Sequence, residues 1–234
     1  MSSDPALSTA AAAELPRGPA ESPATLAGAW ETFFDYWSPR WMAIFASFFV
    51  GLRLALGAYS TWDLAIIAAV LVSWPLQEWL IHVFILHFEP KRIGRFTIDL
   101  RVAKKHREHH RDPWRLDNLF IPTHIHPFAV PAQLLFWWLV TPTLPLAITG
   151  VAIYFVLSLH YEWVHYLVHV RYRPRSRWYG RLWRNHRLHH FMNEHYWFGV
   201  SMLSGDHLLR TAPDRGEVEP SPTCRTLGRT ADLE

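Results

Sequence analysis

The stretch HRLHH, residues 186–190, decides how this 234-residue chain must fold. The same H-x-x-H-H spacing stands far earlier in the chain as HREHH, residues 106–110. On an α-helix the positions i, i+3 and i+4 fall within one face, so each stretch presents three imidazoles side by side. Core packing gives no reason to repeat this spacing, and we therefore predict two metal-binding helices.

Two further histidine pairs extend the pattern. His165 and His169 are four residues apart, which places both imidazoles on one face of a helix. His82 and His87 are five residues apart and fit a shared face poorly, because about 140° separates them on a straight α-helix. We therefore expect the helix that carries His82 to end or loosen just before His87, with Pro90 as a stop signal.

These histidines predict a site for two metal ions. Imidazole is a neutral ligand suited to iron, zinc, copper and nickel. One ion takes about four to six ligands, so ten histidines indicate two ions, each with about five histidines and a coordination position left for oxygen or water. Iron is favoured because zinc has no redox chemistry with which to use that position. The predicted ligands are His82, His87, His106, His109, His110, His165, His169, His186, His189 and His190.

Other polar residues near these histidine motifs, called histidine boxes below, receive separate interpretations. Three histidines are expected to be hydrogen-bonded polar residues or interfacial anchors: His124, His126 and His160. His195 and His207 follow the HRLHH stretch closely. Each is either a hydrogen-bond partner of a metal ligand or a polar residue with no role at the site, and the sequence does not decide between the two. Glu78 and Glu162 either orient a ligating imidazole through its second nitrogen or pair with a neighbouring arginine.

The hydropathy pattern predicts a membrane protein. Half of the residues are hydrophobic and thirteen are tryptophans, which are typical of a membrane interface. Apolar runs cover residues 41–59, 62–81 and 127–160, and the last is long enough for two spans divided near residues 141–145. We predict an all-α fold with four transmembrane helices in two hairpins, the second helix kinked at Pro75, and a cytoplasmic helical cap that holds the metals.

Charge gives the orientation. Residues 91–115 and 171–187 are strongly basic, whereas the turns at 57–61 and 141–145 carry no basic residue. By the positive-inside rule, the basic segments, the metal site and both termini are expected on the cytoplasmic side. The net charge of +3 comes with no nucleic-acid motif, so anionic lipid headgroups are the expected partners and nucleic acid is not. The single cysteine, Cys224, excludes an intramolecular disulfide.

Composition divides the chain into three parts. Residues 1–26 are rich in Ala, Pro and Ser and are predicted to be a disordered arm; they lack the basic and apolar regions of a secretory signal. Residues 27–211 form the predicted membrane-embedded catalytic domain. Residues 212–234 are predicted to be a polar tail.

From residue 78 to residue 211 the chain resembles the integral-membrane fatty acid hydroxylase and sterol desaturase superfamily. Its boxes stand here as EWLIHVFILH, HREHH, HYEWVHYLVH and NHRLHHFMNEHYWFG, in the order that the fatty acid hydroxylase branch shows. The resemblance implies that the ten histidines named above ligate a non-haem di-iron centre, with no catalytic residue beyond the ligands.

The implied activity is O2-dependent hydroxylation of a C–H bond in a lipid acyl chain of the fatty acid or sphingolipid type. Zinc can replace iron in such a site during purification. Some relatives carry a fused cytochrome b5 domain, for which the residues before the first predicted span are too few, so we expect a separate electron donor of the ferredoxin or cytochrome type.

Two alternatives stay open. A carotenoid or sterol hydroxylase or desaturase would use the same centre on another substrate. A membrane metal transporter or sensor would bind ions transiently, but transport predicts ionisable residues in mid-span rather than at span ends. A soluble carboxylate di-iron bundle is set aside, because it needs two E-x-x-H motifs and only Glu162 with His165 supplies one.

Overall fold

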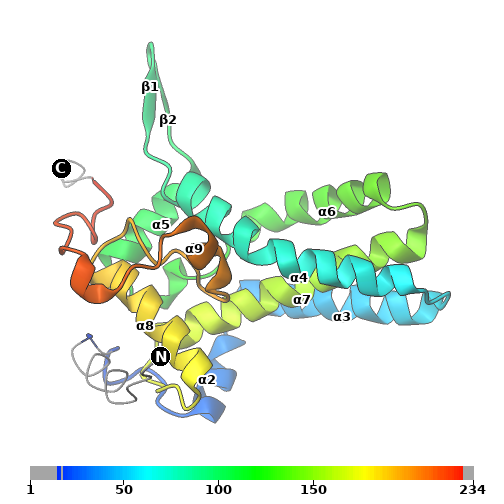
Figure 1. The fold of residues 1–234 in the computed structure, drawn as a ribbon, viewed down its shortest axis with the longest axis horizontal. Helices are drawn as coiled ribbons and strands as arrows, with labels where there is room; N and C mark the ends of the chain where they lie inside the picture. The colour runs from blue at the N-terminus through cyan, green and yellow to red at the C-terminus, as the bar shows by residue number, and fades with distance from the viewer. Residues whose placement is uncertain (1–14, 17, 229–234) are drawn as a thin grey trace.

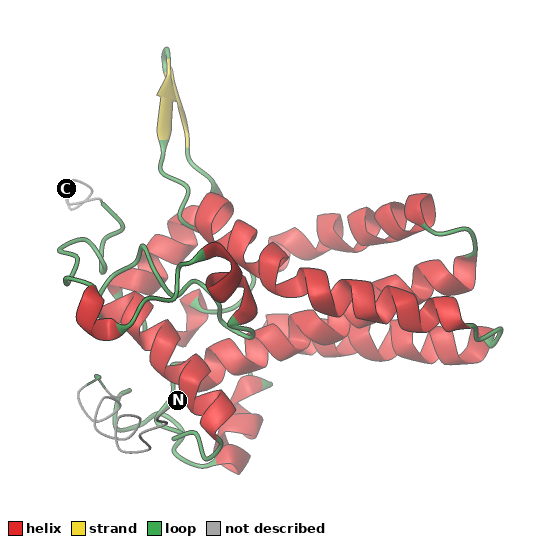
Figure 2. Ribbon diagram, viewed as in Figure 1, coloured by secondary structure: helices red, strands yellow, loops and turns green. Residues whose placement is uncertain are grey.

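Two antiparallel helical hairpins extend from a helical cap in the computed structural model, which describes residues 15–16 and 18–228 (Figures 1 and 2). The first hairpin is formed by α3 (Trp37–Leu56) and α4 (Thr61–Ile81). The second is formed by α6 (His126–Val140) and α7 (Leu144–Val168). Both tight turns lie at the end of the molecule farthest from the cap (Figure 1), as the division predicted near residues 141–145 requires.

Three helical stretches are long and apolar enough to cross a membrane: Trp37–Leu56, Thr61–Leu86 and Leu144–Val168. The predicted fourth span is shorter than expected. Helix α6 begins only at His126, after a 3-10 turn, and ends at Val140, so its 15 residues reach about 22 Å. A hydrocarbon core of about 30 Å needs about 20 residues.

Apolar packing joins α3 to α7 along the bundle. Met42, Ala46 and Phe49 pack against one face of α7, and the rings of Phe49 and Phe155 stack at 5.6 Å. In contrast, many large apolar residues of α3, α4 and α6 point outward and are exposed. Such an outward apolar surface is what helices in lipid require.

Arg53, which interrupts the first apolar run, is buried in a polar network near the turns. Its Nη2 donates to Asp63 Oδ1 at 2.7 Å and its Nε donates to Thr149 Oγ1 at 2.6 Å. Thr149 Oγ1 is also 2.5 Å from Asp63 Oδ1. A paired charge is the form in which an arginine is tolerated inside a membrane bundle, and this network ties α3, α4 and α7 together.

The cap contains the remaining elements. Its helices are α2 (Leu26–Phe33), α5 (Arg101–Arg111), α8 (Arg177–Phe191) and α9 (Ser204–Leu209). Short 3-10 turns are η2 (Leu116–Asn118), η3 (Thr123–Ile125) and η4 (Arg215–Glu217). A β-hairpin of β1 (Lys91–Ile93) and β2 (Phe96–Ile98) projects from the cap (Figure 2), so the fold is mostly helical rather than all-α.

The segments at both ends make contacts that composition did not predict. Residues 1–14, 17 and 229–234 lie outside the described residues, and with them most of the predicted arm. Leu15 is buried with Val168 and Trp183, because it is an apolar side chain beside an apolar cluster. At the other end, residues 221–227 of the predicted polar tail fold back onto the cap, where they contact α5.

Candidate metal centre

All ten predicted ligand histidines come together in two groups of five. In each group one ligand atom from every residue lies within 4.8 Å of the others, a spacing suited to a shared ion. Cluster I consists of His82, His87, His106, His110 and His189. Cluster II consists of His109, His165, His169, His186 and His190.

Each H-x-x-H-H box is divided between the clusters. In α5, His106 and His110 belong to cluster I and His109 to cluster II. In α8 the arrangement is reversed, with His189 in cluster I and the other two histidines in cluster II. Positions i and i+4 are about 40° apart on a helix, whereas i+3 and i+4 are about 100° apart. Each box therefore contributes histidines to both clusters.

A π-helical turn solves the awkward spacing of His82 and His87. Helix α4 changes at its end into η1, a π-helix over His82–Leu86, and His87 N donates to His82 O at 3.0 Å. This i→i+5 bond places residue 87 one turn beyond residue 82 on the same side, and the two rings lie 4.9 Å apart. The helix widens into a π-turn at His82 and ends at Leu86, just before His87, as predicted.

The ring nitrogens of each cluster face one another at short distances. His110 Nε2 is 3.2 Å from both His106 Nε2 and His189 Nε2 in cluster I. In cluster II, His186 Nε2 lies 3.1 Å from His169 Nε2 and 3.0 Å from His190 Nε2. Several other buried nitrogens have no hydrogen-bond partner among the described residues, including Nε2 of His82, His87 and His165. Converging neutral nitrogens of this kind fit a metal cation, which would satisfy all of them at once.

Backbone carbonyls fix the tautomer of three cluster I imidazoles. His82 Nδ1 donates to Phe198 O at 2.6 Å, and His189 Nδ1 donates to Tyr196 O at 2.7 Å. His110 Nδ1 donates to Cys224 O at 2.9 Å. A carbonyl can only accept, so the ring proton is on Nδ1 and the lone pair of Nε2 is directed at the cluster.

Burial keeps the cap histidines neutral. It lowers the pKa of His110 to about 3, and it holds the pKa of His106, His109 and His186 well below the ordinary value, with neighbouring histidines adding to the effect. A neutral imidazole is the form that ligates metal, so these residues are ready to bind an ion at neutral pH.

Two buried carboxylates hold the loop that supplies the Tyr196 and Phe198 carbonyls. Glu78 Oε1 accepts from Val200 N and Ser201 N, each at 2.7 Å. Asp206 accepts from Phe198 N at 3.0 Å and Gly199 N at 2.7 Å. Glu78 thus bonds to the loop backbone behind His82, and among the described residues it bonds neither an imidazole nor an arginine, the two alternatives that the sequence left open. Asp206 and the carbonyl acceptors were not foreseen, since a backbone carbonyl has no sequence signature.

The remaining candidates lie apart from the clusters. Glu162 accepts from Ser38 Oγ at 2.6 Å and Ile121 N at 2.9 Å, and among the described residues it bonds neither an imidazole nor an arginine. His126 is buried beside Ser38, as expected for a hydrogen-bonded polar residue, and His160 stacks on Trp178. His124, His195 and His207 are exposed, and among the described residues no hydrogen bond or ring contact links the last two to a ligand histidine.

Three membrane-length helices and two five-histidine clusters able to bind metal ions define the class of protein. The chain belongs to the fatty acid hydroxylase family, whose model matches residues 67–211, more than half of its length.

Curated relatives agree with this assignment. The dihydroceramide fatty acyl 2-hydroxylase FAH2 of Arabidopsis thaliana is 28% identical over 149 residues, which cover 63% of this chain and 60% of that protein. The fatty acid 2-hydroxylases of Macaca fascicularis and Homo sapiens are 30% and 29% identical, each over 59% of this chain and 37% of their own length. The chain therefore matches less than two thirds of these relatives.

The fold has a solved counterpart. The structure described as full-length Scs7p, in which only the hydroxylase domain is visible, matches with a TM-score of 0.64 at 19% identity. The match covers 79% of this chain and 68% of that one.

Proposed function

We propose that this protein uses two histidine-bound irons and O2 to hydroxylate a lipid acyl chain at C2, the position in the names of its relatives. The observation that carries this proposal is the pair of five-histidine clusters whose ring nitrogens converge, several of them buried without a hydrogen-bond partner among the described residues. Bound iron would supply the redox chemistry that inserts one oxygen atom into a C–H bond, while the other leaves as water after taking up two electrons and two protons.

The protein's own residues prepare the site. Five neutral nitrogens in each cluster leave room for a further ligand on a six-coordinate ion. The carbonyls of Tyr196, Phe198 and Cys224 hold three imidazoles in the ligating tautomer. Burial of the clusters excludes bulk water, which protects reactive chemistry from side reactions.

An apolar groove offers the acyl chain a path beside the site. It has a volume of about 540 Å³ and lies on the outward face of α4 and η1, where Leu80, Phe84 and Ile85 line it. Ile81, another lining residue, directly precedes cluster I residue His82. We propose that an acyl chain in the bilayer lies in this groove, next to the helix segment that carries His82.

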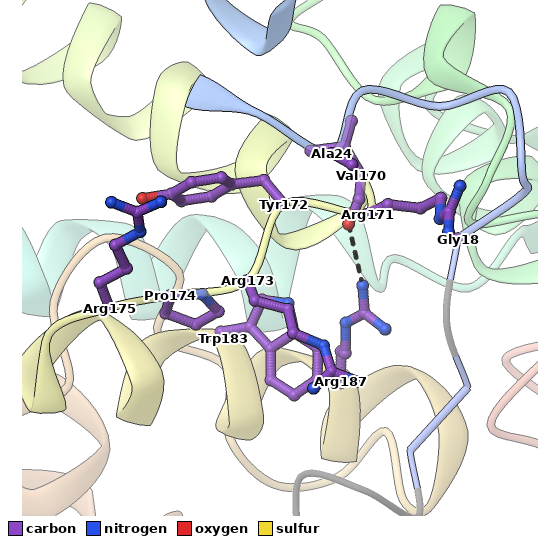
Figure 3. A pocket seen from close by; sticks show the side chains of 10 residues that line it. All are labelled: Gly18, Ala24, Val170, Arg171, Tyr172, Arg173, Pro174, Arg175, Trp183 and Arg187. Carbon is purple, nitrogen blue, oxygen red and sulfur yellow. Dashed lines mark hydrogen bonds between the residues drawn. The ribbon is translucent and has the colours of Figure 1, made fainter. Parts of the chain in front are cut away.

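Electrons are proposed to arrive on the basic face of the cap. A pocket of about 380 Å³ lies on this face. Figure 3 shows Arg171, Arg173, Arg175 and Arg187 lining it, together with Trp183. An acidic ferredoxin or cytochrome would be attracted to this surface.

An aromatic path leads inward from that pocket. The Arg187 guanidinium lies 4.1 Å from the Trp183 ring centre and 5.0 Å from that of Trp114. The Trp114 ring lies 6.2 Å from that of His169 in cluster II. We expect Arg173→Glu with Arg175→Glu to slow turnover several-fold with the protein donor but not with dithionite, whereas exposed Arg101→Glu changes neither. Equal loss with both reductants would contradict this docking site.

In the membrane we place all four bundle helices, with α6 completing the second hairpin. Its exposed side chains Phe128, Trp138 and Leu139 support this placement, since they are apolar and face away from the bundle. The basic cap is placed in the cytoplasm by the positive-inside rule.

Lipid analysis tests the function. Cells that express the wild type are compared with cells that express His189→Ala with His190→Ala, and metal content is measured on both purified proteins. We expect 2-hydroxy acyl lipids with the wild type alone, and about two metal ions per chain in that protein. Hydroxylation at another carbon would contradict the proposed position, and hydroxylation of a sterol would contradict the proposed substrate. Two ions with no new lipid, in the presence of donor and substrate, would favour a metal transporter or sensor.

A further inference from the structure

The β-hairpin of β1 and β2 has a defined register. Its cross-strand pairs are Lys91 with Ile98, Arg92 with Thr97 and Ile93 with Phe96. A two-residue turn joins the strands, and Gly94 at its first position has φ +60°, which a type II′ turn requires.

This register separates the side chains by polarity. Paired residues lie on the same face of a hairpin, and successive pairs alternate between the two faces. Ile93, Phe96 and Ile98 therefore share one face, with Lys91 at its base. The opposite face carries Arg92 and Thr97. The hairpin is thus amphipathic along its whole length.

No other element of the described protein covers the apolar face; within the hairpin itself the Arg95 guanidinium lies 5.0 Å from the Phe96 ring centre. All six strand residues are exposed, and Ile93 and Phe96 are 61% and 64% accessible. A lone two-stranded hairpin is at best marginally stable in water unless its apolar face is covered. An uncovered face of this kind indicates a binding surface.

The base of the hairpin is held firmly in the cap. Arg107 of α5 donates to Phe88 O at 3.0 Å, before β1, and to both carboxylate oxygens of Asp99, after β2, at 2.7 and 2.6 Å. One buried guanidinium therefore fixes both ends, so the direction of the hairpin is set by α5. Figure 1 shows the strands running across the axis of the helix bundle, close to the cap end of α4.

We propose that the hairpin lies in the headgroup layer of an anionic membrane, with Ile93, Phe96 and Ile98 inserted among the lipids. A segment that runs across the spans at their cap end lies along the membrane surface, provided that the bundle crosses the membrane as proposed above. Residues 91–98 carry three basic and no acidic side chains, which suits anionic phosphates. The inference thus rests on the proposed membrane placement and is independent of catalysis.

Spin labels on the two faces test this orientation. In a Cys224→Ser background, one label is placed by Phe96→Cys and a matched label by Thr97→Cys on the opposite face. A third label, by Phe48→Cys on the outward surface of α3, reports whether the bundle itself is in lipid. Each variant is placed in nanodiscs of phosphatidylcholine with or without phosphatidylglycerol, and the relative collision rates of the label with oxygen and a nickel chelate are measured.

We expect the ratio of oxygen to nickel accessibility to be several-fold higher at Phe96 than at Thr97, and to rise further with phosphatidylglycerol. Arg92→Ala with Arg95→Ala should remove the rise. Equal, water-like ratios on both faces overturn the proposal, provided that the Phe48 label is in lipid. Spin–spin broadening at Phe96 without lipid dependence would also overturn it, because a second copy would then cover the face. A water-like Phe48 label would instead refute the membrane placement.

Discussion

At the residue scale, neighbouring histidines serve different clusters. His109 and His110 are adjacent in sequence, yet one lies in cluster II and the other in cluster I. The sequence predicted the ten residues and two groups of about five. It could not predict the division, because that depends on how α5 and α8 face each other. Their role as ligands stays a prediction.

Double substitutions test the division of the boxes. We expect His106→Ala with His110→Ala to remove cluster I alone and leave about one ion per chain. His109→Ala with His110→Ala damages both clusters, so well under one ion should remain. Metal content of the purified variants gives the answer, with exposed His195→Ala as the control that keeps two. Equal losses in both double variants would show that a box acts as one unit.

Glu78 is a positioning residue whose removal should weaken cluster I. Without its carboxylate, the amides of Val200 and Ser201 lose their acceptor and the Phe198 carbonyl is no longer held against His82. Partners of this kind change metal affinity about 10- to 100-fold. We expect Glu78→Ala to lower metal affinity within that range, measured by chelator competition.

Gln77→Ala, at the neighbouring position in the lipid-facing groove, is the matched control for this substitution. An unchanged affinity in Glu78→Ala would show that the loop holds its carbonyls without the carboxylate.

At the element scale, helix contacts set the geometry of the bundle. Gly150 of α7 faces Trp137 of α6 so closely that a Cβ would lie 2.1 Å from the indole. Gly150→Ala should therefore push α6 outward and destabilise the protein by about 1–3 kcal/mol. Thermal unfolding in detergent measures this, and Trp137→Ala in the same chain should recover part of the loss. If the destabilisation by Trp137→Ala simply adds to that by Gly150→Ala, the two residues are not in contact.

The elements were predicted best where hydropathy decides them. The two hairpins and the break between α6 and α7 follow from apolar runs and prolines. The π-turn at His82 was missed, because α- and π-helical turns differ by a single residue and leave the same composition. The β-hairpin was missed because its six strand residues are embedded in a basic segment that reads as a charged loop.

At the scale of the whole molecule, burying many imidazoles makes folding depend on pH. Burial lowers the pKa of the cap histidines in the folded state, whereas the unfolded chain titrates near 6.5. Above that pH both states are neutral; below it the unfolded state gains more protons, so stability falls. At pH 5.5 each imidazole that stays neutral in the folded state lowers the free energy of unfolding by about 1 kcal/mol.

We therefore expect the unfolding midpoint of the metal-free protein to drop by at least about 5 °C between pH 7.5 and pH 5.5. Differential scanning calorimetry in detergent measures the midpoint. An equal or higher midpoint at pH 5.5 would mean that the clusters accept protons in the folded state.

Segments far apart in sequence meet at the metal centre. The polar tail supplies the Cys224 carbonyl to His110, and Arg225 donates to the backbone of the same residue at 2.8 Å. Sequence reasoning assigned that segment no role, since neither contact uses a residue type typical of metal sites.

We propose that irons in the two clusters use O2 to hydroxylate an acyl chain. The most direct test supplies the iron-loaded wild type with dithionite, ¹⁸O2 and an acyl lipid, and examines the product by mass spectrometry. We predict a 2-hydroxy acyl product that contains one ¹⁸O atom and is absent with His189→Ala. Product oxygen from water, or no product from protein with two reduced irons, would contradict the account.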